Sequence, residues 1–207
     1  WQLFGFTGLY IINFGDLAVI KHFLTTEDVA IYNAAYKIFF GVAGLSYAII
    51  NYYASEISGA LESRNFSRII RFYRSERKKI LILIIPGLLL LMATSKWTIP
   101  ILCGRQYIQS AGIFSILIFG GIFQYISLFY TIFLNTEKRY KFLQTINISR
   151  AFINIILDII LIKFLGIYGP AVATVLALFI AFYILYIYSE KKINNYYEKK
   201  ENFISAA

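Results

Sequence analysis

Residues 111–134, which read AGIFSILIFGGIFQYISLFYTIFL, decide the fold class of this chain. They contain no charged side chain, and as an α-helix rising about 1.5 Å per residue they can cross the roughly 30 Å of hydrocarbon in a bilayer. A helix also satisfies its own backbone hydrogen bonds, which lipid cannot do. The stretch therefore predicts a transmembrane helix.

Five more apolar stretches of similar length predict five more spans. The six expected helices cover residues 3–20, 30–53, 80–97, 111–134, 142–165 and 171–188. Pro86 is expected to kink the third helix, and Pro170 stands where the first turn of the sixth tolerates proline. The predicted fold class is all-α: a polytopic membrane protein with a six-helix unit over residues 1–190 and a basic tail over residues 191–207.

The composition agrees with a lipid environment. Hydrophobic residues make up 59% of the 207 and charged residues only 15%, against about a quarter in soluble domains. Cys103 and His22 are the only residues of their types, so an internal disulfide, a cysteine or histidine metal site and histidine-based catalysis are not expected. We predict no catalytic residue, no metal site and no cofactor. Because the chain opens at Trp1 inside an apolar run, we expect an N-terminal part to precede it.

The basic residues predict the orientation. Fourteen of the 20 lie in segments 64–79, 138–141 and 191–200, which share one side of the expected bundle. The opposite side carries only four: Lys21, Lys96, Arg105 and Lys163. By the positive-inside rule the tail is cytoplasmic, so the net charge of +9 reports topology rather than nucleic-acid binding.

Residues 66–73 leave two interpretations open. Apolar residues recur there at helical spacing beside a face crowded with arginines. They could form a helix on the inner leaflet that binds anionic lipid headgroups, or an ordinary cytoplasmic connector that obeys the positive-inside rule.

Polar side chains inside the expected spans mark the candidate site, because each ionisable group there costs about 2.5–3.5 kcal/mol on insertion scales. The residues expected on the translocation path are Asp16, Asn33, Lys37, Asn147, Arg150, Asn154 and Asp158. The last four recur every three or four residues and share one face of the fifth helix. Such faces must meet one another or a water-filled cavity.

Two roles are open for these residues. Asp16 with Lys37, and Arg150 with Asp158, could be ion pairs that hold helices together. Alternatively the side chains line a cavity, where arginine suits phosphate oxygens and asparagine suits sugar hydroxyls.

Several segments, taken in order, resemble bacterial polysaccharide-unit flippases, a family of the multidrug/oligosaccharidyl-lipid/polysaccharide exporter superfamily. Asp16 followed by residues 26–38 (TEDVAIYNAAYKI) resembles that family's seventh and eighth helices, and residues 102–107 (LCGRQY) are similar to the start of its tenth. Residues 134–138 (LNTEK), Arg150, Asn154 and residues 166–174 (GIYGPAVAT) look like its eleventh and twelfth. Ala30 departs from the pattern, since the family usually has glycine there.

The resemblance implies the C-terminal lobe of a protein of about twelve helices, partnered by an N-terminal lobe. It also implies the function: translocation of undecaprenyl-diphosphate-linked oligosaccharide across the bacterial inner membrane for surface polysaccharides such as O-antigen or capsule. H⁺ and Na⁺ are the candidate coupling ions, and no enzymatic activity is implied. A drug/cation antiporter, a peptidoglycan-precursor flippase and, in a different class, a membrane-embedded sugar polymerase or ligase stay open as alternatives.

Overall fold

A computed structural model describes residues 14–63 and 65–205, with side chains described as far as residue 195. Residues 14–23 are helical. They are followed by α2 (Thr26–Glu62), α3 (Phe66–Arg71), a π-helical turn (Phe72–Glu76), α4 (Arg77–Ala93), α5 (Ser95–Cys103), a 3₁₀ turn (Arg105–Tyr107), α6 (Ser110–Thr136), α7 (Tyr140–Leu165) and α8 (Tyr168–Ser205). The described part of the chain contains no strand, which confirms the all-α fold class.

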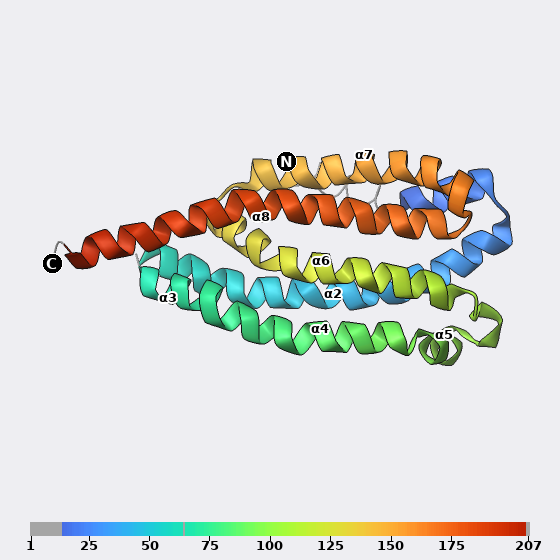
Figure 1. Cartoon of the computed structure of the whole chain (residues 1–207), viewed down its shortest axis with the longest axis horizontal. Coiled ribbons are helices and arrows are strands. Elements are labelled where there is room, and N and C mark those ends of the chain that lie inside the picture. The colour runs from blue at the N-terminus through green and yellow to red at the C-terminus, as the bar shows by residue number, and fades with distance from the viewer. Residues whose placement is uncertain (1–13, 64, 206–207) are drawn as a thin grey trace.

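The long helices form an elongated bundle. α6 packs against both α2 and α8, and α7 packs against α8 on the other side (Figure 1). The C-terminus and α3 lie at one end of the bundle, and α5 lies at the other (Figure 1). We call these the C-terminal end and the α5 end. Hydroxyls fix α6 to the backbone of α2: Ser110 donates to the carbonyl of Ile31 at 2.7 Å, and Tyr125 donates to that of Val42 at 2.6 Å.

The helix starts follow from local sequence. α2 begins with a capping box, in which the Thr25 hydroxyl accepts from the Asp28 N–H at 3.2 Å and the Asp28 carboxylate accepts from the Thr25 N–H at 3.0 Å. Glycine is required at the start of α8 for a different reason, the close approach of the α7 and α8 backbones. A Cβ on Gly169 would lie 2.6 Å from the backbone nitrogen of Ile162.

Several helices are long and apolar enough to span a membrane. Among the described residues these are α2, α6 and residues 168–195 of α8, with a fourth if Phe66–Ala93 and α5 form one bent span. α7, which carries Arg150, Asp158 and Lys163, is not among these helices. The chain is therefore consistent with a membrane protein, while six spans remain a prediction. Residues 3–13 of the first expected span lie outside the described part.

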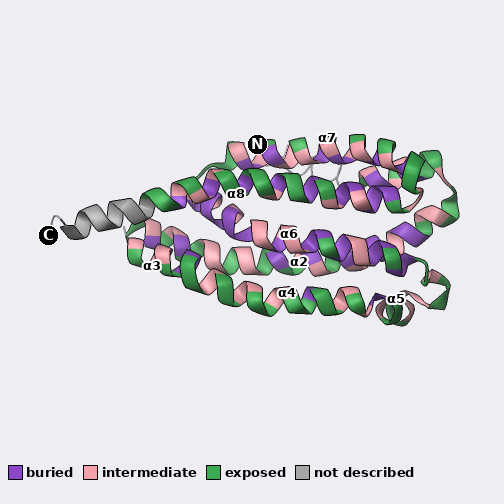
Figure 2. Cartoon of the chain, in the orientation of Figure 1, coloured by how far each residue is buried: buried purple, intermediate pink, exposed green. Residues whose placement is uncertain are grey.

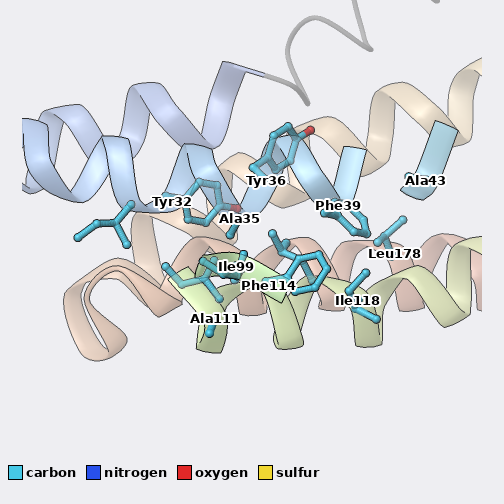
Figure 3. Close-up of a cluster of buried hydrophobic side chains, with 14 of the residues drawn as sticks. Tyr32, Ala35, Tyr36, Phe39, Ala43, Ile99, Ala111, Phe114, Ile118 and Leu178 are labelled. Carbon is cyan, nitrogen blue, oxygen red and sulfur yellow. The ribbon is translucent and has the colours of Figure 1, made fainter. Parts of the chain in front are cut away.

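Buried apolar side chains form two clusters. One joins α2 and α6 around Tyr32, Phe39 and Phe114 toward the α5 end (Figure 3). The other lies toward the C-terminal end and includes Phe72 and Phe129. Large apolar side chains also cover the outside of the bundle, where buried and exposed residues alternate along each helix (Figure 2). An apolar exterior of this kind suits lipid rather than water.

Several expected boundaries differ from the structure, two of them clearly. The third expected helix runs to Trp97, but α4 ends at Ala93 and the chain bends by 76° into α5, so Trp97 lies on α5. The tail over residues 191–207 is not separate, because α8 continues to Ser205.

Residues 66–73 belong to a helical run that leads directly into α4, and their apolar side packs on protein. Ile69 and Tyr73 are buried, and the Tyr73 hydroxyl donates to the carbonyl of Phe129 at 3.3 Å. Arg68 is paired with Glu56 and Glu76. These contacts favour a connector packed on the bundle over a helix lying on the leaflet.

Candidate functional site

Four polar side chains from three helices meet inside the bundle. Asp16 comes from the helix over residues 14–23, Asn154 and Asp158 from α7, and Thr174 from α8; all four are buried. Asn154 and Asp158 are one turn apart, so both face the same neighbours. Tyr32 of α2 completes the group through its hydroxyl. We call these five residues the carboxyl cluster.

The hydrogen bonds of the cluster converge on Asp16. One carboxylate oxygen accepts from the Asn154 amide at 2.7 Å. The other accepts from the Thr174 hydroxyl at 3.0 Å and from the Tyr32 hydroxyl. Three donors on one buried carboxyl group are the arrangement expected where a charge must be stabilised without water.

Asp158 is less well satisfied. Its Oδ2 accepts from the same Asn154 nitrogen at 3.1 Å, while its fully buried Oδ1 has no hydrogen-bond partner among the described residues. One amide nitrogen therefore bridges two buried carboxyl groups. Two such groups cannot both stay negatively charged unless a cation lies between them, so the arrangement suits either a bound proton or a small cation.

The donor set fits a hard cation. Two carboxyl groups, two hydroxyls and the amide of Asn154 offer oxygen ligands, which Na⁺-like ions prefer over nitrogen or sulfur. Asn154 here directs its nitrogen at both carboxyl groups, and a flip of that amide would present its oxygen instead. No cluster of three or more histidine, cysteine or acidic side chains occurs among the residues described.

Beside the cluster lies a cavity of about 500 Å³ between α2, α6, α7 and α8. Its polar lining consists of Ser46, Tyr47, Gln124, Ser127, Thr131, Asn135, Tyr140, Gln144, Asn147 and Arg150. Among the described residues of that lining, Arg150 is the only ionisable group besides the two tyrosines, and none is a carboxylate. The interior is therefore positively charged at one point and otherwise rich in amides and hydroxyls.

A smaller pocket connects the cavity to the carboxyl cluster. Arg150, Tyr47 and Gln124 line both hollows, and Asn154 and Thr174 line the smaller one. Two members of the cluster thus form part of the wall next to Arg150. A change in the hydrogen bonds of Asn154 would therefore alter the pocket wall that it shares with Arg150, which also lines the cavity.

The structure brings together five of the seven residues predicted on the translocation path. Asp16, Asn154 and Asp158 meet in the cluster, Asn147 and Arg150 line the cavity, and Arg150 and Asn154 share the smaller pocket. Neither of the two ion pairs left open by the sequence is present: none of the four ion pairs among the described side chains involves these residues.

Asn33 and Lys37 do not join the site. Lys37 is exposed on α2, and neither residue lines the cavity or the smaller pocket. The buried face of α2 instead carries Tyr32 and Tyr36.

Sequence reasoning missed Tyr32 and Thr174. Tyrosine and threonine are common in membrane helices and carry no charge, so neither attracts notice alone. The available signal was indirect: a buried aspartate needs donors, and hydroxyls in the neighbouring helices are candidates.

Comparison with known proteins gives no assignment, since no family model, no curated protein and no solved structure matches this chain.

Proposed function

We propose that this chain is a six-helix lobe of a twelve-helix transporter that moves lipid-linked oligosaccharide across the bacterial cytoplasmic membrane, with its C-terminus on the cytoplasmic side. The observation that carries the proposal is the cavity whose described lining holds Arg150 as its single cation, bordered by a buried carboxyl cluster. The resemblance of the helix-end motifs to polysaccharide-unit flippases supplies the substrate class.

The cavity lining matches the two chemical parts of such a substrate. Arg150 can bind diphosphate oxygens through its planar, permanently charged guanidinium. The surrounding amides and hydroxyls offer donors and acceptors to sugar hydroxyls. None of the described lining residues is a carboxylate that would repel the diphosphate, so the charge of the lining favours an anionic substrate over a cationic one.

The carboxyl cluster supports coupling to H⁺ or Na⁺. Either cation would reduce the repulsion between Asp16 and Asp158 and would change the hydrogen bonds of Asn154. Because Asn154 lies in the wall shared with Arg150, cation binding and substrate binding are expected to affect each other.

The test is complementation of a flippase-deficient strain by the full-length protein, with surface polysaccharide and protein abundance measured together. Arg150→Lys keeps the charge but loses the planar fork, so export should fall about tenfold or more at normal abundance, as expected for a lost charge-assisted hydrogen bond. Lys37→Gln is the matched control, since it removes a cation from a span without touching the cavity. Normal export by Arg150→Lys and Arg150→Gln would refute the role of the arginine.

A second candidate is a cation-coupled drug exporter of the same architecture, which the buried carboxyl cluster favours equally. The two functions differ in the role of Arg150. A cationic drug would gain from Arg150→Gln, whereas an anionic lipid would lose affinity. Drug resistance of cells carrying that variant, measured beside polysaccharide export, separates them.

A further inference from the structure

The short helix α5 lies across the bundle rather than along it. It makes an angle of 76° with the run Phe66–Ala93, and Figure 1 shows it nearly end-on at the α5 end. Buried Ile99 and a 2.8 Å hydrogen bond from the Ser115 hydroxyl to that of Ser95 hold it against the bundle. Because the long helices run in the spanning direction, α5 runs close to the plane of the membrane.

The outer side of α5 is apolar and uncovered. Trp97 is 67% exposed, Ile101 80% and Leu102 62%. Large apolar side chains on a helix lying in the membrane plane are typical of interfacial helices, and tryptophan prefers the headgroup level. The position therefore suits contact with lipid at the height of the headgroups.

Two cations border a hollow at this helix. Lys96 and Arg105 line a pocket of about 510 Å³ together with Trp97, Pro100, Ile101 and Ile108. None of the described residues that line the pocket is acidic, and neither cation takes part in the ion pairs found among the described side chains. Lys163, another cation on this side, is instead placed 6.0 Å above the Phe23 ring.

We propose that this pocket binds the headgroup phosphate of an anionic phospholipid, whose acyl chains run beside Trp97 and Ile101. The cations supply the charge complementarity, and the apolar lining supplies the contact with the chains. A soluble anion would leave the apolar part of the pocket uncovered, so the lipid is the better match. The site lies at the opposite end of the bundle from the basic connector around Arg68.

The natural tryptophan of the pocket can report the occupant. The chain has two tryptophans, so Trp1→Phe leaves Trp97 as the only one. The full chain is placed in bilayers of phosphatidylcholine and phosphatidylglycerol at a fixed ratio, with bromine on the acyl chains of one lipid or the other. Quenching of Trp97 then measures which lipid lies beside it.

Brominated phosphatidylglycerol should quench Trp97 more strongly than brominated phosphatidylcholine at equal content. Each basic residue near a membrane surface enriches an anionic lipid about fivefold, so Lys96→Gln with Arg105→Gln should remove the preference while leaving quenching by phosphatidylcholine intact. The retained phosphatidylcholine signal shows that the variant is folded and inserted. Lys163→Gln, which removes a cation of the same side outside the pocket, should leave the preference unchanged.

Four results would overturn the proposal. The first two are equal quenching of Trp97 by the two lipids in the parent protein, and a phosphatidylglycerol preference that survives the double substitution. The third is a loss of that preference in Lys163→Gln equal to the loss in the double variant. The fourth is displacement of phosphatidylglycerol from Trp97 by millimolar inorganic phosphate. The last would identify the ligand as a soluble anion.

Discussion

Asn154 is the residue whose removal tests the carboxyl cluster most directly. Its amide nitrogen donates to Asp16 at 2.7 Å and to Asp158 at 3.1 Å. Asn154→Leu preserves size but removes both bonds. Asp16 keeps Tyr32 and Thr174 as donors, whereas Asp158 is left with no partner among the described residues.

The expected cost follows from these two bonds. Hydrogen bonds to charged groups contribute about 1.5–3 kcal/mol each, but hydrogen bonds in membrane proteins average only about 0.6 kcal/mol. Asn154→Leu removes two such bonds, and the loss of one of them leaves the buried Asp158 carboxyl group unpaired. We therefore expect this variant to lose about 2–4 kcal/mol in the free energy of unfolding. The assay is reversible unfolding of the purified chain in detergent micelles.

A matched control lies two turns earlier on the same helix. Asn147 lines the cavity and has no side-chain hydrogen bond among the described residues, so Asn147→Leu should change stability by less than about 0.5 kcal/mol. The double variant Asn154→Leu, Asp158→Leu removes the unpaired carboxyl group and should be more stable than the sum of the two single changes predicts. Strict additivity, or equal effects of the two asparagine substitutions, would refute the cluster.

Three further outcomes are expected. Gly169→Ala should destabilise the chain by about 1–3 kcal/mol in the same assay because its Cβ meets backbone at 2.6 Å, whereas Gly44→Ala, with open space around it, should be neutral or slightly stabilising. Glu190→Gln should cost about 1 kcal/mol, since that carboxylate is 2.9 Å from Arg77 in a half-buried pair; Arg77→Gln should add little once Glu190 is replaced. For the proposed orientation, a cysteine at Thr25 on a cysteine-free background should react with an impermeant reagent in intact cells, and one in the tail should not; the reverse pattern would invert the topology.

Much of the fold could be read from the sequence because helical signals are local. The long apolar runs, the polar side chains on one face of α7 and the charged connections correspond to helices and turns in the structure. The errors have physical causes. The expected span 80–97 runs through the polar residues Thr94, Ser95 and Lys96, which follow Ala93. A short polar interruption can lie inside a straight helix as well as at a 76° bend, so it does not decide between the two.

The predicted ion pairs failed for a related reason. Pairing Asp16 with Lys37 assumed that opposite charges on consecutive helices meet. In the bundle Asp16 is surrounded by hydroxyl and amide donors, and Lys37 turns to the outside of α2. Neutral donors stabilise a buried carboxyl group without burying a second charge, which would be costly.

By itself the sequence determined the apolar helices, the charge asymmetry between the two ends and the face of α7 on which Asn147, Arg150, Asn154 and Asp158 stand. Helical periodicity assigns a side chain to a face but does not say which helix that face meets. Only the tertiary structure decided that Asp16 meets Asn154, 138 residues later, and Thr174, 158 residues later. Those contacts depend on α8 packing between α6 and α7, an arrangement set by side-chain packing across the whole bundle rather than by any local pattern.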